Sequence, residues 1–390
     1  MGERLRLMSE LPTVVDSPAA LSQVVDLLAA GTGVIGVDAE RAGSYRYSQR
    51  AYLVQLYRRG APVLLLDPIG LTDFTGLAAV LDTDVWVMQA AHNDLDCLAD
   101  LGLRPRELFD TEIAAQLLGL EKVGLASLVE SQLGYEMRKS HGQADWSKRP
   151  LRRSWLEYAA LDVEVLPDLH DELAERLAAA QKTDWAQQEF VHQMRDRIPV
   201  DPHERWRRTN TAGRLRSDVQ RGALRELWNL RDTLAQQRDL SWHRIVRDQV
   251  LVEMARRLPT STDALEAIPN LPGNVMQRSS QWLAAIQRGA ADPAKPLERA
   301  EGPPARSLKA WEQRDPAAAA RWVAVRGALS DRADELQVWT QTLLAPDIVA
   351  EMAWNPPAHP ARRLAELGAR PWQVDHTADL FESLGAADPA

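Results

Sequence analysis

Two carboxylates near the start of the chain are spaced so that they can serve one site. Asp38 and Glu40 are two residues apart at the end of the run Val34-Ile-Gly-Val-Asp-Ala-Glu. Residues two apart on a β-strand project from the same face, so both acids would point to one place. Ionised carboxylates this close repel one another unless a cation lies between them, and their oxygen atoms suit Mg²⁺ or Mn²⁺. The spacing favours a metal site, although an isolated Asp-x-Glu is more often the exposed end of a strand.

Two further patterns add polar groups that could join this site. Tyr158 and Asp162 are four residues apart, which places a phenol and a carboxylate on one face of a helix. Asp94 stands where a strand pattern gives way to a helical one, a position where an aspartate often serves only as a helix cap. Each pattern alone has an ordinary structural explanation. Their occurrence together and in this order favours a shared active site.

The elements that must position these residues are strands first and helices later. We predict strands at residues 34–40, 52–57, 62–68 and 85–90, and the short connections between the first three favour an antiparallel meander. A helical pattern then runs through Leu95 and ends at Gly102. After Phe109 the chain reads as almost wholly helical, with one long amphipathic run over residues 153–181. The sequence therefore predicts an α/β domain.

The rest of the chain is predicted to be helical and divided by linkers. Residues 195–213 are polar and Arg-rich, and residues 290–304 have four prolines and no apolar period. A length of 390 residues suggests two or three domains. The predicted division is into an α/β domain, a helical bundle, a linker and a second helical domain, at residues 1–200, 214–289, 290–306 and 307–390.

Composition places the chain in the globular class and narrows its environment. Apolar residues make up 45% and charged residues 26% of the sequence, which excludes a disordered or fibrous protein. There is neither an apolar run of about 18 to 20 residues nor an N-terminal secretory segment, so we expect no membrane association and a cytoplasmic location. The single cysteine, Cys97, excludes an intramolecular disulfide and is expected to be a buried thiol.

Charge is distributed unevenly. The net charge of −9 argues against a nucleic-acid-binding protein, because such proteins usually carry a basic excess. Two local runs are basic, however, and a groove needs only a few cations along the path of a strand. The alternative is that both runs are simply solvated surface. Their basic members are Arg138, Lys139, Lys148, Arg149, Arg152 and Arg153 in the first, and Arg205, Arg207, Arg208, Arg214 and Arg216 in the second.

The three patterns of polar residues resemble the exonuclease motifs of the DEDD superfamily, in the tyrosine branch that includes the ribonuclease D family. Tyr52-Leu-Val-Gln-Leu and Phe109-Asp-Thr match further, and Ala144-Asp-Trp-Ser-Lys-Arg-Pro-Leu151 is the most specific segment. The resemblance covers residues 10–195 and implies a ribonuclease H-like mixed sheet with helices. One departure is Gln89, where many relatives carry a histidine five residues ahead of the aspartate. We expect altered surroundings of Asp94 rather than a lost metal, with His92 exposed.

The C-terminal half resembles a different kind of domain. The segments Leu227-Trp-Asn-Leu-Arg-Asp-Thr-Leu-Ala and Leu251-Val-Glu-Met-Ala-Arg-Arg-Leu-Pro are similar to the HRDC domain, a helical module that binds nucleic acid. The last region, with Gly368-Ala-Arg-Pro-Trp-Gln, resembles a degenerate second copy. The resemblance thus implies an α/β exonuclease domain followed by all-α HRDC-type bundles.

These resemblances imply a function and a role for each residue. Asp38, Glu40 and Asp162 would hold one divalent ion, Mg²⁺ or Mn²⁺, and Asp38 with Asp94 a second. Tyr158 would orient the attacking water, since a phenol that titrates near ~10 is a poor base. Contacts to the substrate are assigned to Gln55, Lys148 and Arg149. The implied activity is 3′→5′ hydrolysis of RNA to 5′-mononucleotides by two metal ions. The expected partners of this monomer are single-stranded RNA 3′ ends and structured RNA such as tRNA precursors.

Two other functions remain open at this point. A DNA exonuclease of the same superfamily would carry the same acids, because no motif here shows a contact to the 2′-hydroxyl of RNA. The HRDC-like region and the segment from Trp146 to Leu151 favour the ribonuclease. An RNA-binding scaffold without nuclease activity would keep the fold. All five candidate catalytic positions are filled, however, which argues against it.

Overall fold

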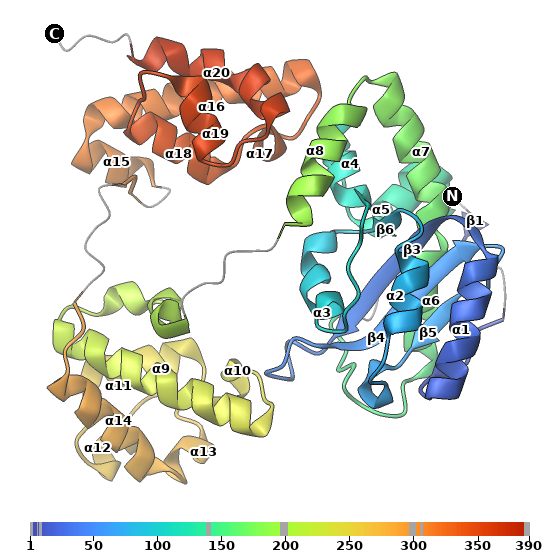
Figure 1. Ribbon diagram of the computed structural model, residues 1–390. Coiled ribbons are helices and arrows are strands. Elements are labelled where there is room, and N and C mark those ends of the chain that lie inside the picture. Colours follow the sequence, from blue (N-terminus) through green and yellow to red (C-terminus); the bar gives the residue numbers. More distant parts are fainter. Residues whose placement is uncertain are drawn as a thin grey trace.

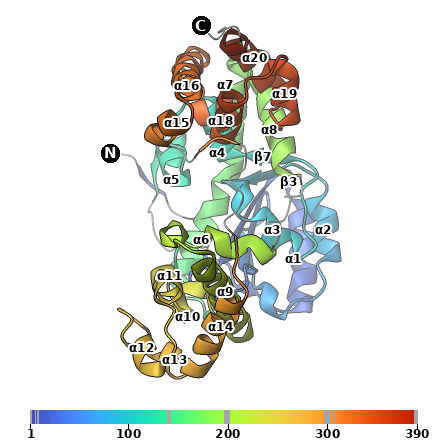
Figure 2. The ribbon, with the colours of Figure 1, turned by 90° about the vertical axis from the view of Figure 1, so that its left-hand side faces the viewer.

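The computed structural model describes residues 3–5, 7, 10–137, 142–195, 202–295, 302–304 and 307–385. Three lobes follow one another along the chain (Figure 1 and Figure 2): an α/β lobe, a helical lobe over residues 202–295 and a second helical lobe over residues 307–385. The predicted fold class, an α/β domain followed by all-α bundles, is confirmed. Cys97 is buried, as expected.

A six-stranded mixed sheet organises the α/β lobe, in the order β2-β5-β4-β3-β6-β7. The pairs β3–β4 and β4–β5 are antiparallel, which confirms the predicted meander, and β6 and β7 continue the sheet in parallel. A separate parallel pair joins β1 (Glu3–Arg4) to β8 (Tyr135–Glu136). The strands of the large sheet are β2 (Val14–Val15), β3 (Thr32–Arg41), β4 (Ala51–Arg59), β5 (Leu64–Leu66), β6 (Trp86–Met88) and β7 (Leu108–Asp110).

The structure differs from the predicted elements in two places. Residues 108–110 form a strand, β7, where helices were expected, because three residues are too few to show a period-two pattern. The single helical run predicted over residues 153–181 is two helices, α6 (Arg153–Glu164) and α7 (Leu166–Ala179). The chain turns between them, and Pro167 occupies the first turn of α7, where its missing N–H costs no hydrogen bond.

Helices cover the sheet and bring α6 close to β3. The main elements besides α6 and α7 are α1 (Pro18–Ala30), α2 (Thr75–Leu81), α3 (Leu95–Ala99), α4 (Thr111–Leu117), α5 (Leu125–Leu128) and α8 (Thr183–Gln193). Both α6 and α7 contact β3. A Cβ atom at Gly36 would lie 2.8 Å from the carbonyl oxygen of Val163. Only glycine therefore allows the C-terminal part of α6 to approach β3 this closely, two residues before Asp38.

The second lobe has a hydrophobic core of its own. Its longest helices, α9 (Asp218–Arg238) and α14 (Ser279–Ala291), meet at Gly222 and Gly289, where a Cβ atom on either would lie 2.2 Å from the other's carbonyl oxygen. A capping box between Ser217 and Gln220 begins α9. The remaining helices are η4 (Pro202–Arg208), η5 (Ala212–Arg214), α10 (Trp242–Ile245), α11 (Asp248–Arg257), α12 (Thr262–Glu266) and α13 (Gly273–Met276).

The third lobe shares its hydrophobic core with the α/β lobe. Its helices are α15 (Leu308–Arg314), α16 (Pro316–Leu336), α17 (Thr340–Leu343), α18 (Pro346–Trp354), α19 (Pro360–Glu366) and α20 (Pro371–Gly385). At the joint the Lys182 ammonium donates to the carbonyl oxygens of Leu117 and Leu336, both at 2.7 Å. Trp372 stacks on Trp185 with ring centroids 4.9 Å apart. Among the described helices, none is long and apolar enough to span a membrane.

Candidate active site

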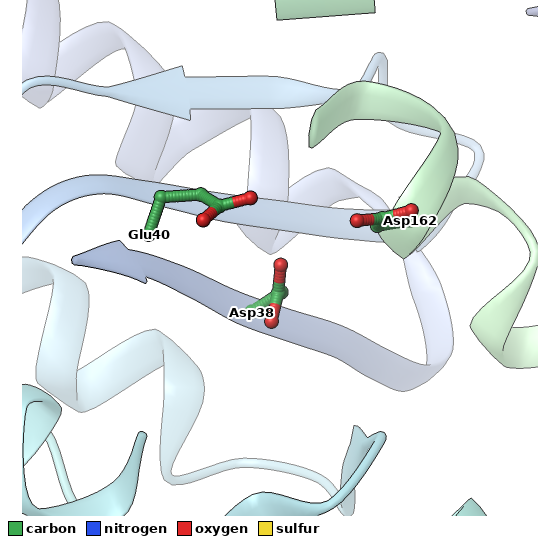
Figure 3. A group of neighbouring side chains, drawn as sticks. All are labelled: Asp38, Glu40 and Asp162. Carbon is green, nitrogen blue, oxygen red and sulfur yellow. The ribbon is translucent and has the colours of Figure 1, made fainter. Parts of the chain in front are cut away.

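The structure brings three of the predicted acids together. Asp38 and Glu40 come from β3 and Asp162 from α6, and one carboxylate oxygen of each lies within 4.8 Å of the others. Figure 3 shows the three carboxylates directed toward a common space between the strand and the helix. The period of two along β3 and the close approach of α6 at Gly36 produce this convergence.

Burial raises the pKa values of all three acids, and the neighbouring carboxylates raise those of Glu40 and Asp162 further. Burial raises the pKa of Asp38 to about 6. It raises the pKa of Glu40 to about 10, with a further increase from the charges of Asp38 and Asp162. The pKa of Asp162 also lies well above its ordinary value, first through burial and then through Asp38. Oxygen ligands that repel one another in a buried cleft fit a divalent cation, which would neutralise them.

Asp94 lines the same cavity of about 460 Å³ but is held differently. Its carboxylate accepts a hydrogen bond from Nε of Arg41 at 3.1 Å. Burial, and then the charge of Asp38, raises the pKa of Asp94 to about 8. Arg41 is not among the predicted site residues, because strand alternation places it on the face opposite Glu40. A bulge in the pairing of β3 with β4 between Glu40 and Arg41 breaks this alternation.

A buried aspartate that carries no predicted role positions the loop before Asp94. The carboxylate of Asp110 accepts hydrogen bonds from the backbone N–H groups of Ala90 at 3.1 Å and Ala91 at 2.8 Å. It also accepts from N–H of Glu112 at 2.8 Å, which caps α4. Ala90 adopts the left-handed conformation, with φ 53°, so the loop needs this support. In the sequence, Phe109-Asp-Thr is recognisable only as a match to the family. In the structure, its Asp110 holds the loop that precedes Asp94.

Gln89 lines the cavity, yet both ends of its amide bond to the protein. Its Oε1 accepts from the Thr111 hydroxyl at 2.7 Å, and its Nε2 donates to the carbonyl oxygen of Val123 at 3.0 Å. The amide therefore connects the end of β6 to α4, through Thr111, and to the segment before α5, through Val123. His92 is exposed, as expected, and does not border this cavity.

Tyr158 lies on α6, one turn before Asp162, and also borders the cavity. Its hydroxyl donates a hydrogen bond to the Asp162 carboxylate. Burial, together with the charges of Asp162 and Glu40, raises the pKa of Tyr158 above its ordinary value of 10.0. The phenol is thus a neutral hydrogen-bond donor at physiological pH and does not act as a base.

The three residues assigned to substrate contacts differ in their surroundings. Gln55 pairs with Asp38 across the strands and is fully buried, and within the described residues its amide nitrogen and oxygen have no hydrogen-bond partner. Its side chain is not among those that line the cavity. The Arg149 guanidinium donates to Asp67 at 2.5 Å and to the carbonyl oxygen of Tyr52 at 2.8 Å. These bonds fix the loop to β4, and the assignment of Arg149 to phosphate binding stays a prediction. The Lys148 side chain is 68% exposed and pairs with Asp145 at 3.8 Å, and its assignment also stays a prediction.

The rest of the first basic run is largely occupied or outside the described residues. Arg138 and Lys139 fall in the undescribed part of the chain. Arg152 lies over the ring of Trp155, and Arg153 pairs with Glu157 at 2.8 Å. Solvated surface is the better description of these two arginines.

Comparison with known families gives a match for each lobe. A model described as "3'-5' exonuclease" matches residues 12–178, which carry all the acids of the site. A model described as "HRDC domain" matches residues 220–286. Residues 302–384 match a model described as "3' to 5' exonuclease C-terminal domain". The interpretation of this last region as a second HRDC-like copy stays a prediction.

Individual relatives agree with these matches. The chain is 35% identical to ribonuclease D of Xanthomonas oryzae pv. oryzae, over 65% of this chain and 70% of that protein. It is 32% identical to ribonuclease D of Escherichia coli K12, over 71% and 73%. For ribonuclease D of a Shewanella species, also 32% identical, the aligned part spans 61% of the relative's length.

Solved structures extend the similarity to the full length. A protein from Bifidobacterium adolescentis superposes with a TM-score of 0.87 at 31% identity, covering 98% of this chain and 99% of that one. E. coli RNase D has the same fold, with a TM-score of 0.73 over 97% and 99% of the two chains at 24% identity. Family models, relatives and fold together confirm the resemblance, and the chain belongs to the ribonuclease D family of 3′–5′ exoribonucleases, with an exonuclease domain and an HRDC domain.

Proposed function

We propose that this chain removes 5′-mononucleotides from the 3′ end of RNA by hydrolysis with two divalent metal ions, Mg²⁺ or Mn²⁺. The observation that carries the proposal is the convergence of Asp38, Glu40 and Asp162 within 4.8 Å. Asp94 borders the same cavity. Asp38, Glu40 and Asp162 would hold one ion, and Asp38 with Asp94 the other. Ions bound there would activate water and stabilise the charge on the leaving 3′ oxygen.

The side chains around the acids position the carboxylates and water, and they do not transfer protons. Tyr158 keeps its proton and donates it in a hydrogen bond toward Asp162, which fixes that carboxylate and leaves a phenol oxygen at the cavity to orient water. Arg41 balances the charge of Asp94. Asp110 holds the loop that carries Asp94. The chain thus supplies a preorganised acidic cleft with the Arg41 guanidinium beside it.

RNA is the proposed substrate because the curated relatives are ribonucleases and E. coli RNase D is described as "an exoribonuclease involved in structured RNA processing". We extend this to the 3′ ends of structured RNA such as tRNA precursors, acted on by a monomer. The exonuclease, HRDC and second helical domains at residues 1–200, 214–289 and 307–390 would share this task. A DNA exonuclease is the alternative, and it is decided by the same assay.

The test compares RNA and DNA strands of one sequence, each labelled at the 5′ end, with Mg²⁺, Mn²⁺ or a chelator. We expect stepwise shortening of RNA from the 3′ end, release of 5′-mononucleotides and no reaction with the chelator. Asp38→Asn should be inactive with either metal. Faster shortening of DNA than of RNA would contradict the proposed substrate, and hydrolysis by Asp38→Asn at saturating metal would contradict the site.

A further inference from the structure

The second lobe, residues 202–295, contains the HRDC domain and is called here the HRDC lobe. A second cavity, of about 840 Å³, lies where this lobe meets the loop between β3 and β4. Its lining includes Gly43 and Tyr47 from this loop, and Arg205, Trp242 and Arg247 from the HRDC lobe. Gly43 also borders the acidic cavity, so the two cavities adjoin along one loop. In Figure 1 this loop extends from the α/β lobe toward α10.

Hydrogen bonds fix the HRDC lobe to this loop. The backbone N–H groups of Tyr47 and Ser48 donate to the Asp239 carboxylate at 3.1 and 3.0 Å. In return, the backbone N–H of Ser241 donates to the carbonyl oxygen of Tyr45 at 3.2 Å. The Ser241 hydroxyl donates to the carbonyl oxygen of Ser44 at 3.0 Å. Tyr47 follows Glu40 by seven positions in the sequence, which limits the distance between them to about 25 Å for an extended chain. The second cavity is therefore held within a few nucleotides of the acids.

Trp242 forms an exposed aromatic surface in this cavity. Of the thirteen tryptophans it alone is exposed, at 37%. It is nevertheless rigidly held, because its Nε1 donates to Asp232 at 2.8 Å and its ring meets Tyr47 edge-on, with centroids 6.0 Å apart. Trp228 supports the ring from inside the HRDC lobe at 5.6 Å. A fixed, exposed indole is a platform on which a nucleic-acid base can stack.

The same cavity carries positive charge that the protein does not neutralise. Within the described residues, neither Arg205 nor Arg247 makes an ion pair or a side-chain hydrogen bond. Asp248 also lines the cavity, but its carboxylate binds Arg231 at 2.5 Å and the backbone N–H of Asn210 at 2.8 Å. In a chain with a net charge of −9, two unpaired guanidinium groups beside an exposed indole complement a phosphate backbone with unstacked bases.

We propose that this cavity, called here the Trp242 cavity, binds a nucleotide of single-stranded RNA upstream of the 3′ end that lies in the acidic cleft. The base stacks on Trp242, and Arg205 and Arg247 contact the adjacent phosphates. The inference rests on the proposed function and adds a second subsite to it. Strands long enough to reach the Trp242 cavity gain affinity from it, whereas a dinucleotide is bound at the acidic cleft alone.

The test measures binding in the full chain with Asp38→Asn, which prevents degradation. Fluorescent RNA strands from a dinucleotide to about 16 nucleotides are titrated, since single-strand sites cover about 4 to 16 nucleotides. Trp242→Ala should weaken binding of the long strands about 5- to 150-fold, the effect of losing one stacked base. Binding of the dinucleotide should not change. Trp242→Phe should restore most of the affinity, because it keeps a ring on which the base can stack.

Charge is tested with a matched pair of arginines. Arg247→Ala should weaken binding of long strands and reduce the slope of log affinity against log salt by about 0.7. Arg247 is exposed and unpaired within the described residues, so this variant is expected to fold normally. Arg288→Ala is the control, because Arg288 lies on α14 of the same lobe, pairs with Glu226 at 3.4 Å and does not line the cavity.

Each outcome bears on the inference. Equal losses for short and long strands would overturn it, as would unchanged affinity of long strands in Arg247→Ala. An unfolded Trp242→Ala protein leaves the decision to Trp242→Phe and Arg247→Ala. If instead the active chain hydrolyses no RNA while the length dependence is present, the proposed function fails and the binding site stands.

Discussion

The Arg41 guanidinium lies 3.1 Å from the Asp94 carboxylate, beside the three acids that converge from β3 and α6. Arg41 therefore competes with a metal ion for Asp94. We expect Arg41→Ala to bind Mn²⁺ roughly 5- to 10-fold more tightly, because both this competition and the repulsion of a nearby cation are removed. Titration calorimetry measures the change. Arg106→Ala, which removes an exposed arginine paired with Asp82, is the control and should bind as the original chain does.

Removing a carboxylate at the centre of the site should abolish activity without unfolding the protein. Asp162→Asn takes away a proposed metal ligand, and the raised pKa of Asp162 indicates that a neutral group at this buried position costs little stability. We expect no detectable hydrolysis and an unchanged or higher unfolding temperature in chelator. Glu121→Gln removes an exposed acid elsewhere and should retain full activity. Normal turnover by Asp162→Asn at saturating metal would contradict the assignment.

Tyr158→Phe removes one hydrogen bond to Asp162 and almost no volume. A hydrogen bond to a charged group contributes about 1.5 to 3 kcal/mol, so hydrolysis should slow roughly 10- to 150-fold. The affinity for RNA should not change. Because the pKa of Tyr158 lies above 10.0, the pH profiles of variant and original should run parallel below about pH 9. A loss of affinity without a loss of rate would make Tyr158 a substrate contact instead.

Stability without metal should fall as the pH rises. The pKa values of Asp38 and Asp94 are raised to about 6 and about 8, whereas in the unfolded chain aspartate titrates near ~4. At a pH between the unfolded and folded pKa values, the folded state binds more protons than the unfolded state. The free energy of unfolding therefore decreases as the pH rises through this range. We expect the unfolding temperature in chelator to decrease from pH 5 to pH 8 relative to the Asp38→Asn variant. Saturating Mg²⁺ should reduce this difference, since the ion replaces the protons. A steeper decrease in the variant would contradict the explanation.

The buried joint between the α/β and third lobes should be sensitive to Glu189. This carboxylate is 5% exposed and accepts from Arg370 and from the Trp372 indole, both at 2.7 Å. Glu189→Gln leaves Arg370 without its counter-charge, which typically costs about 3 to 5 kcal/mol when an ion pair is buried. The free energy of unfolding in urea measures the loss. Glu366→Gln, which weakens an exposed pair with Arg362, should have little effect.

Local periodicity was sufficient to find the acids but not their surroundings. The period of two along β3 predicted that Asp38 and Glu40 share a face, and the helical period predicted that Tyr158 and Asp162 do. Arg41 escaped because a single bulge changes its direction. Gln55 pairs with Asp38, so strand alternation places both on one face, but its complete burial depends on tertiary packing that no local pattern shows. Arg149 is occupied by Asp67, a partner 82 positions away in the sequence, which no local pattern shows.

Because the first and third lobes share one hydrophobic core, the α/β domain cannot finish folding until the third lobe has been synthesised. The HRDC lobe, with its separate core, is inserted in the sequence between two parts that pack as one body. During synthesis the surface around Trp185 stays exposed until Trp372, which lies 187 positions later in the sequence, has been made and can cover it. Until then the nascent protein presents an apolar face that can associate wrongly, as exposed surfaces of folding intermediates do. Helices α15 to α20 therefore complete a core that the N-terminal part of the chain begins.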